Sequence, residues 1–181
     1  MSRWQALLVA TVLLAILSPI ILVLVLFAAL DSRSTGLFTQ TRIGQHAQPF
    51  TIYKLRTMVN GRVTTLGRFL RRTKLDELPQ LVNVIKGDMT FVGPRPDLPG
   101  YYDRLEGSDR NILKLKPGLT SRAAIKYRNE ERLLQQQEDP EQYNDRILFP
   151  DKVSMNMEYL EKRSLQYDLK IIWITIISLF K

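Results

Sequence analysis

Two neighbouring carboxylates, Asp76 and Glu77, lie in the stretch 71–96, which reads RRTKLDELPQLVNVIKGDMTFVGPRP. Basic side chains precede the pair, and a rigid Gly-Pro-Arg-Pro sequence containing Arg95 ends the stretch. An ionised carboxylate can serve as a nucleophile or a metal ligand, and nearby cations neutralise the charge on phosphate oxygens. This combination of residues therefore suits phosphoryl chemistry.

A helix from about residue 76 to 86 is expected to carry the pair. Apolar residues recur at helical spacing along this range, and Gly87 follows as a stop signal. Proline is tolerated only in the first turn of a helix, so Pro79 locates the start of this one. The spacing therefore predicts Asp76 at the N-cap or the first helical position.

Local physics leaves two interpretations of the pair open. As a structural feature, Asp76 caps the helix and Glu77 complements its dipole, with Thr73 as an alternative cap. As a chemical feature, the positive potential at the helix start and the adjacent cations keep Asp76 ionised and pointed outward. Capping is the commoner use of an Asp-Glu pair at a helix start, so the local sequence alone favours it.

An uncharged segment, residues 4–30, occupies the N-terminal part of the chain. As one straight helix it would rise about 40 Å, more than the ~30 Å hydrocarbon core requires. Ser18 and Pro19 lie at its centre, where proline removes a backbone hydrogen bond and clashes with the carbonyl four residues back. A helix that bends there could return to the same face of the membrane, with Ser18 satisfying the freed carbonyl. Local physics favours a spanning helix, followed by re-entry and then by a cleaved signal peptide.

The remaining elements predict a helix-dominated α+β fold. Two β-prone runs, 37–43 and 50–56, predict a hairpin, and a short basic helix is expected over about 63–72. A polar stretch around Pro140 predicts two short exposed helices broken near that residue. The C-terminal segment 164–181 is too short to span a membrane and is either a buried core helix or an amphipathic helix at the interface.

Composition excludes several kinds of site. The 181 residues include no cysteine and one histidine, which excludes disulfides, thiol catalysis and a histidine-rich metal site. An apolar fraction of 45% excludes disorder as the general state of the chain. The formal charge of +8 favours anionic partners, either phosphates or acidic lipid headgroups. Nucleic-acid binding has little support, because the basic residues are not interleaved with stacking aromatics.

The order of motifs along the chain resembles the bacterial sugar transferase family, the monotopic phosphoglycosyl transferases. An apolar segment broken at Ser-Pro is followed by FTQTRIG, YKLRTM, LGRFLRRTKLDELPQLVNVIKGDMTFVGPRP, KPGLT and DLKI. The resemblance implies transfer of a sugar 1-phosphate from a nucleotide sugar, usually a UDP sugar, to polyprenol (undecaprenyl) phosphate. It also implies Mg²⁺ as cofactor and a first membrane step in the assembly of O-antigen, capsule, exopolysaccharide or a glycoprotein glycan.

The resemblance assigns roles to individual residues. It implies that Asp76 is the nucleophile, which holds a phospho-sugar intermediate after UMP has left. It implies that Glu77 assists through the metal or the acceptor, so that the two carboxylates are also the metal ligands. The phosphate and nucleotide contacts expected by the same matching come from four basic residues: Lys54, Arg71, Arg95 and Arg128.

The resemblance also implies a membrane topology. Residues 1–30 are expected to form a re-entrant helix kinked at Ser18 and Pro19, which reverses the local preference for a spanning helix. A catalytic domain, 31–163, is expected on the cytoplasmic face of the bacterial inner membrane, and 164–181 as an interfacial amphipathic helix.

One stretch departs from the family pattern. Many members continue after KPGLT with Gly-Trp-Ala-Gln-Val-Asn-Gly, whereas this chain reads Ser-Arg-Ala-Ala-Ile-Lys-Tyr over residues 121–127. The chain also lacks the large multispan N-terminal region of longer relatives, so a minimal catalytic form is expected. Two other functions are carried as alternatives: a membrane-bound nucleotide-sugar phosphodiesterase and a non-catalytic basic membrane adaptor.

Overall fold

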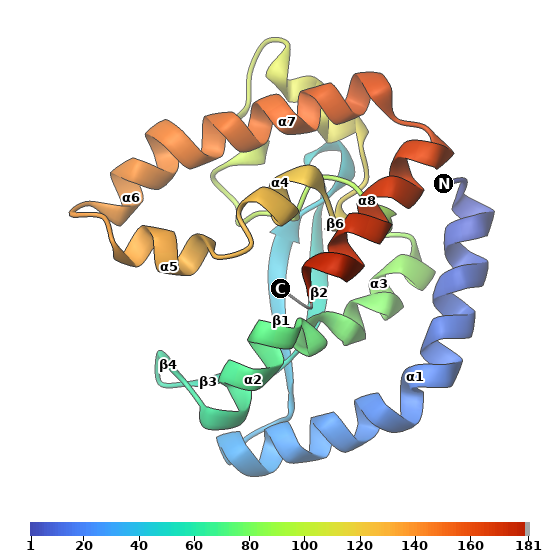
Figure 1. Cartoon of the computed structure of the whole chain (residues 1–181), viewed down its shortest axis with the longest axis vertical. Helices are drawn as coiled ribbons and strands as arrows, with labels where there is room; N and C mark the ends of the chain where they lie inside the picture. Colours follow the sequence, from blue (N-terminus) through green and yellow to red (C-terminus); the bar gives the residue numbers. More distant parts are fainter. Residues whose placement is uncertain (180–181) are drawn as a thin grey trace. The chain divides into compact units, whose positions relative to one another are not determined.

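The computed structural model describes residues 1–179, and it divides into two compact units. The first unit comprises Met1–Arg42 and Pro49–Thr90, and the second comprises Ile43–Gln48 and the chain from Phe91 onward. Helices dominate both units, and the described strands form three two-stranded sheets: β1–β2, β3–β4 and β5–β6 (Figure 1). The predicted helix-dominated α+β class is confirmed.

The first unit contains the long N-terminal helix and the segment with the paired carboxylates. Its elements are α1 (Arg3–Ser32), β1 (Leu37–Ile43), β2 (Pro49–Leu55), β3 (Met58–Val59), β4 (Arg62–Val63), α2 (Thr65–Thr73), the 3₁₀ helix η2 (Leu75–Gln80) and α3 (Leu81–Lys86). Strands β1 and β2 pair across a five-residue connection, too short for a parallel crossover. The predicted hairpin is therefore confirmed, and α2 lies within two residues of the predicted basic helix.

Helix α1 is a single element with Pro19 inside it, and Figure 1 shows that it bends near its middle. The Ser18 hydroxyl donates a hydrogen bond to the Ala15 carbonyl over 3.0 Å. Ala15 lies four residues before Pro19, so its carbonyl is the one that the missing proline N–H leaves without an intrahelical donor. The predicted role of Ser18 at the kink is confirmed.

Both arms of α1 turn small side chains toward the rest of the first unit. Ala6 and Ala10 are buried in the first arm, and Ala28 and Ser32 are buried in the second. Small residues allow close backbone approach to neighbouring elements. Ile21 is buried as well, and the exposed apolar side chains of the helix are Trp4, Leu8, Val9, Val12, Ile16, Ile20, Leu22, Val23, Leu26, Phe27 and Leu30. By length and composition α1 could cross a membrane, with a mean hydropathy of 3.0.

The second unit is built mostly from short helices around α7. Its elements are η1 (Gln45–Ala47), β5 (Thr90–Val92, from Phe91), η3 (Tyr102–Arg104), η4 (Asp109–Lys114), β6 (Gly118–Thr120), α4 (Arg122–Lys126), α5 (Glu130–Gln135), α6 (Pro140–Tyr143), the π-helix η5 (Asn144–Leu148), α7 (Phe149–Lys162) and α8 (Leu165–Ser178). Helices α5 and α6 confirm the two short helices predicted around Pro140, which begins the second of them.

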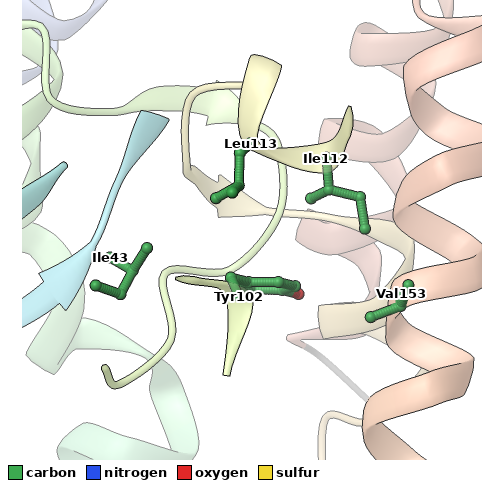
Figure 2. Packing of buried hydrophobic residues seen from close by; sticks show 5 residues of the cluster. All are labelled: Ile43, Tyr102, Ile112, Leu113 and Val153. Atoms are coloured by element: carbon green, nitrogen blue, oxygen red, sulfur yellow. The ribbon is translucent and has the colours of Figure 1, made fainter. Parts of the chain in front are cut away.

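Buried apolar side chains from distant parts of the sequence meet in the second unit. Figure 2 shows Ile43, Tyr102, Ile112, Leu113 and Val153 packed together. Burial raises the pKa of the Tyr102 phenol, whose oxygen accepts a hydrogen bond from the Asn156 side-chain amide over 2.9 Å. This cluster joins the segment before η1 to η3, η4 and α7.

Helix α8 is anchored to α7 by a buried polar contact. The Tyr159 hydroxyl donates to Oδ1 of Asp168 over 2.6 Å, and burial together with this carboxylate raises the pKa of the phenol. Ile171 is also buried, whereas Trp173 on the same helix is 64% exposed. Helix α8 is therefore not a fully buried core helix, and residues 180 and 181 of the predicted C-terminal segment lie outside the described residues.

Gly118 lies at the closest approach of two backbones, and replacing it by alanine is expected to destabilise the fold. A Cβ atom at Gly118 would lie 2.1 Å from the backbone nitrogen of Gly93. Backbone cannot move aside cheaply, so we expect Gly118→Ala to lower the free energy of unfolding by about 2 to 4 kcal/mol. Thermal unfolding followed by circular dichroism measures the loss.

Gly107→Ala is the matched control for this substitution. A Cβ atom at Gly107 would meet nothing within 4 Å, and only its φ of +57° opposes a side chain. Its expected cost is about 1 kcal/mol. Equal destabilisation by the two variants would contradict the close approach at Gly118.

Candidate active site

The segment that carries Asp76 and Glu77 is a 3₁₀ helix followed by an α-helix. The prediction of one helix from about 76 to 86 is wrong in this respect: η2 covers Leu75–Gln80 and α3 covers Leu81–Lys86. Pro79 lies inside η2, where it has no N–H to continue an α-helical ladder. The predicted end of the helix is confirmed, since Gly87 follows α3 in the left-handed conformation with a φ of 94°.

Neither of the predicted capping roles is present. The N-cap position of η2 is Lys74, in the left-handed conformation, and within the described residues no side-chain hydrogen bond caps this start. The Thr73 hydroxyl donates backward to the Phe69 carbonyl over 2.8 Å. Asp76 is only 7% exposed. The expectation that Asp76 points outward from a helix cap is therefore wrong, because η2 packs against β2 and α2 and this side chain is buried.

Lys54 and Glu77, predicted separately as site residues, meet in the first unit. Lys54 Nζ donates to Glu77 Oε1 over 3.4 Å, and the two side chains are 18% and 13% exposed. Strand β2 carries Lys54 and packs against η2. Packing of these two elements thus holds a cation beside the carboxylate pair.

Asn83 supports the site, although the sequence motifs do not point to it. It is fully buried in α3. Its Oδ1 accepts from the Tyr53 backbone N–H over 3.2 Å, and its Nδ2 donates to the Thr51 carbonyl over 2.7 Å. These bonds fix α3 to β2 directly beside Lys54. A single amide within the apolar run LVNVI was the signal that could have revealed it.

Arg71 lies in the last turn of α2, in the same unit as the carboxylate pair. Its Nη1 lies 3.4 Å from the sulfur of Met58, and the residue is partly buried. Helix α2 ends at Thr73 and contacts η2. Lys54, Arg71, Asp76 and Glu77 are therefore carried by neighbouring elements of the first unit.

Arg95 and Arg128 belong to the second unit. Arg95 is exposed between Pro94 and Pro96, both of which are buried. This arrangement agrees with the idea that the flanking prolines fix the backbone from which the guanidinium projects. Arg128 is partly buried and lies in the turn between α4 and α5.

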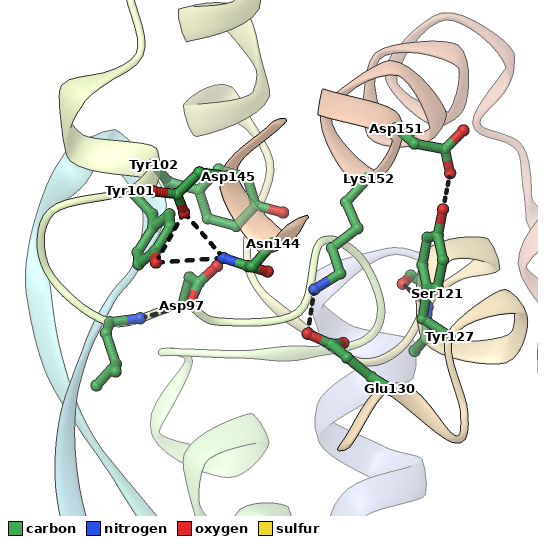
Figure 3. Close-up of polar contacts among 12 residues, drawn as sticks. Asp97, Tyr101, Tyr102, Ser121, Tyr127, Glu130, Asn144, Asp145, Asp151 and Lys152 are labelled. Atoms are coloured by element: carbon green, nitrogen blue, oxygen red, sulfur yellow. Dashed lines mark hydrogen bonds and ion pairs between the residues drawn. The ribbon is translucent and has the colours of Figure 1, made fainter. Parts of the chain in front are cut away.

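The stretch that departs from the family pattern is firmly attached to α7. Figure 3 shows the Tyr127 hydroxyl donating to Oδ2 of Asp151 over 2.6 Å, and Lys126 Nζ lies 2.8 Å from the same oxygen. The hydrogen bond from Lys126, with that from Tyr127, holds the pKa of Asp151 below its usual value. Lys152, the next residue of α7, donates through Nζ to Glu130 of α5 over 2.6 Å. The turn that carries Arg128 is thus bracketed by two ion pairs to α7.

The acidic pair does not form a complete metal site by itself. In residues 1–179, no group of three or more histidine or carboxylate side chains is placed to hold a metal ion. Mg²⁺ is commonly bound by one or two carboxylates, with substrate phosphates and water completing the octahedron. Two carboxylates that are neighbours in the sequence, with a cation beside one of them, match this kind of site, in which a phosphate substrate would supply further ligands.

Comparison with known proteins shows similarity along the whole chain. The profile of the family described as bacterial sugar transferase matches residues 1–181. The UDP-glucose:undecaprenyl-phosphate glucose-1-phosphate transferase of Escherichia coli (strain K12) is 31% identical over 198 residues, covering 99% of this chain and 40% of the relative. A sugar transferase of Bacillus subtilis (strain 168), EpsL, is 35% identical over 179 residues, covering 92% of this chain and 81% of the relative. A UDP-glucose:undecaprenyl-phosphate glucose-1-phosphate transferase of Caulobacter vibrioides is 35% identical over 187 residues, covering 94% and 66%.

Proposed function

Because the chain belongs to the bacterial sugar transferase family, we propose that it transfers a sugar 1-phosphate from a UDP sugar to undecaprenyl phosphate. The chain spans about two fifths of the Escherichia coli relative whose name describes this reaction with UDP-glucose. The structural observation that carries the proposal is the Asp76–Glu77 pair, held in a 3₁₀ helix with Lys54 against Glu77. A carboxylate pair next to a cation suits a reaction in which a phosphate changes partners.

The proposed reaction has two steps, with Asp76 as the nucleophile. In the first, an Asp76 carboxylate oxygen attacks the sugar-bearing phosphorus, a P–O bond to the enzyme forms, and the bond to the bridging oxygen breaks. UMP leaves with that electron pair. In the second, a phosphate oxygen of undecaprenyl phosphate attacks the same phosphorus, and the bond to Asp76 breaks to restore the carboxylate. Two steps remove the need to hold both bulky anions in one reactive complex.

The basic residues are proposed to bind the phosphates and the nucleotide. Lys54 already lies beside the pair, where it can neutralise a phosphate that approaches Asp76. Arg71, Arg95 and Arg128 are assigned the same class of role, since a guanidinium binds phosphate oxygens in a bidentate way.

Mg²⁺ is proposed as the cofactor, with Asp76 and Glu77 as its protein ligands. When bound, it would neutralise diphosphate oxygens and the charge of the departing UMP. We expect EDTA to lower turnover at least about a hundredfold and Mg²⁺ to restore it. Nucleotide monophosphate release measured against free Mg²⁺ checks this, and Glu77→Gln should raise the concentration needed for half-maximal rate. Full turnover in EDTA would contradict the metal assignment.

The membrane part of the proposal is that α1 re-enters on the side from which it came. Both ends of α1 are bonded to other elements of the first unit. Arg3 bonds to α3 at one end, and the Arg56 backbone N–H, next to β2, donates over 2.8 Å to the carbonyl of Gly36, which follows the other end. A straight helix of 30 residues would separate its ends by about 45 Å. The bend at Pro19 shortens that separation (Figure 1), and in the proposed topology the exposed apolar surface of α1 would face the hydrocarbon.

The exposed face of α8 is proposed to lie in the same membrane interface. It carries exposed Leu165, Leu169, Trp173, Ile176 and Ile177. Tryptophan and aliphatic side chains on one face are typical of helices at the level of the lipid headgroups. With the catalytic residues outside the hydrocarbon, the proposed location is the cytoplasmic face of the bacterial inner membrane.

The decisive experiment measures UMP release from a panel of UDP sugars by membranes that contain the protein. Release that depends on undecaprenyl phosphate, with the sugar phosphate recovered on lipid, is the expected result. Free sugar 1-phosphate produced without the lipid would instead identify a phosphodiesterase. Membrane binding with no UMP release from any sugar would identify a non-catalytic adaptor.

A further inference from the structure

Arg3 connects the N-terminal arm of the membrane helix to the segment that carries the catalytic carboxylates. Its Nη1 donates to the Val84 carbonyl, and its Nη2 donates to the Ile85 carbonyl over 2.7 Å. These are carbonyls of the last turn of α3, which follows η2 directly. One guanidinium therefore joins residues that lie 81 and 82 positions apart in the sequence.

The position of Arg3 is explained by its bonds to α3 and not by a role within α1. It is the first residue of α1, where a cation opposes the helix dipole. Its charge lies instead against the C-terminal end of α3, where the negative end of the helix dipole attracts a cation. A planar guanidinium donates to two successive carbonyls from two separate nitrogens in a fixed geometry, whereas an ammonium has only one nitrogen from which to donate.

Several features fix this contact in place. Ser2 and Gln5 form a capping box, with the Ser2 N–H donating to Gln5 Oε1 over 2.8 Å, so the start of α1 cannot slip. Ala6 and Ala10, three and seven residues after Arg3, are buried on the same helix face. Gly87 provides the space: a Cβ atom there would lie 2.9 Å from Arg3 Nη2.

The local geometry of the catalytic pair is held by other contacts. Lys54 bonds Glu77, and Asn83 bonds two backbone groups of β2. Loss of the Arg3 bonds would therefore leave the carboxylates, the cation and β2 arranged as they are. It would change only where this group of elements lies relative to the first arm of α1, and so its depth at the bilayer.

We infer that Arg3 is a positioning residue that sets the depth of the Asp76 segment relative to the membrane-embedded acceptor. The inference rests on the proposed function. UDP sugar arrives from solution and needs no fixed depth, whereas the phosphate of undecaprenyl phosphate is held at the headgroup level by its chain. Arg3 should therefore matter for transfer to the lipid and not for the release of UMP.

The test compares Arg3→Lys with wild-type protein in liposomes that contain undecaprenyl phosphate. Arg3→Lys keeps the charge and so the electrostatic attraction to headgroups. It loses the pair of guanidinium hydrogen bonds to the Val84 and Ile85 carbonyls. We expect a normal stoichiometric burst of UMP without acceptor and a ten- to hundredfold slower transfer to the lipid, the scale of a misplacement of about 1 Å. Arg33→Lys is the matched control, because Arg33 is exposed at the other end of α1.

Two outcomes would overturn the inference. Equal lipid transfer by Arg3→Lys and wild type would show that the charge suffices. Equal slowing of the UMP burst and the lipid transfer would show that Arg3 only stabilises the fold.

Hydrogen exchange, which requires no catalytic turnover, tests this inference separately from the proposed function. The backbone N–H of Gly87 bonds the Asn83 and Val84 carbonyls in the turn that Arg3 holds. Its hydrogen exchange should be about tenfold faster in Arg3→Lys and unchanged in Arg33→Lys. Wild-type protein without any UMP burst would contradict the proposed mechanism, and unchanged exchange in Arg3→Lys would contradict the link.

Discussion

Replacing Asp76 by asparagine is expected to reduce sugar-phosphate transfer at least about a thousandfold, the scale seen when a covalent nucleophile is removed. Asparagine has almost the same shape, so it can occupy the 7% exposed position without a cavity. Its amide cannot form the bond to phosphorus. The rate of UMP release in the presence of undecaprenyl phosphate is the measurement.

The covalent step can be observed directly in the same experiment. Wild-type protein given UDP sugar without acceptor should gain the mass of one sugar phosphate, and Asp76→Asn should gain none. Glu77→Gln keeps the nucleophile, so it should still be labelled, but more slowly. Labelling of Asp76→Asn, or turnover above about a tenth of wild type, would remove Asp76 as the nucleophile.

Asp109→Asn is the matched control for this substitution. Asp109 begins another six-residue 3₁₀ helix, η4, as an acidic residue in its first turn, and it is exposed. The same chemical change there should leave turnover unchanged. A comparable loss in both variants would indicate a general effect of removing an acidic group from a basic protein.

The second large effect concerns membrane topology, where we expect both ends of α1 to be labelled from the same side. The chain has no cysteine, so single cysteines can be introduced without background. One is inserted between Met1 and Ser2, which preserves the capping box, and the other replaces Ser34, which is exposed after the helix. Glu141→Cys in α6 provides a reference for the catalytic side.

An impermeant maleimide should label all three positions in inside-out vesicles and none of them in intact cells. The physical reason is that both arms of α1 are tied to the first unit, at Arg3 and at Gly36. Gly36 also lies close against the second arm of α1, since a Cβ atom there would be 1.9 Å from the Val25 carbonyl oxygen. Labelling of the N-terminal cysteine from the opposite side to Ser34→Cys would establish a spanning helix instead.

Tertiary packing determined several features that the local sequence could not predict. Asp76 and Glu77 looked like helix-capping residues, because a proline three residues later normally marks a first turn. In the structure Lys74, in the left-handed conformation, precedes a 3₁₀ helix in which Asp76 is buried, and Asp76 is not the cap. Helix capping depends on φ and ψ at one residue, and the surrounding packing can override a local preference.

The sequence by itself indicated the acidic pair and several of the elements. The acidic pair, the hairpin, the basic helix and the kink at Ser18 and Pro19 follow from residue types and short-range spacing, which fix backbone conformation locally. Only the tertiary structure decided which groups meet. Lys54 reaches Glu77 across 23 positions and Arg3 reaches Val84 across 81, because contacts between distant residues depend on how whole elements pack.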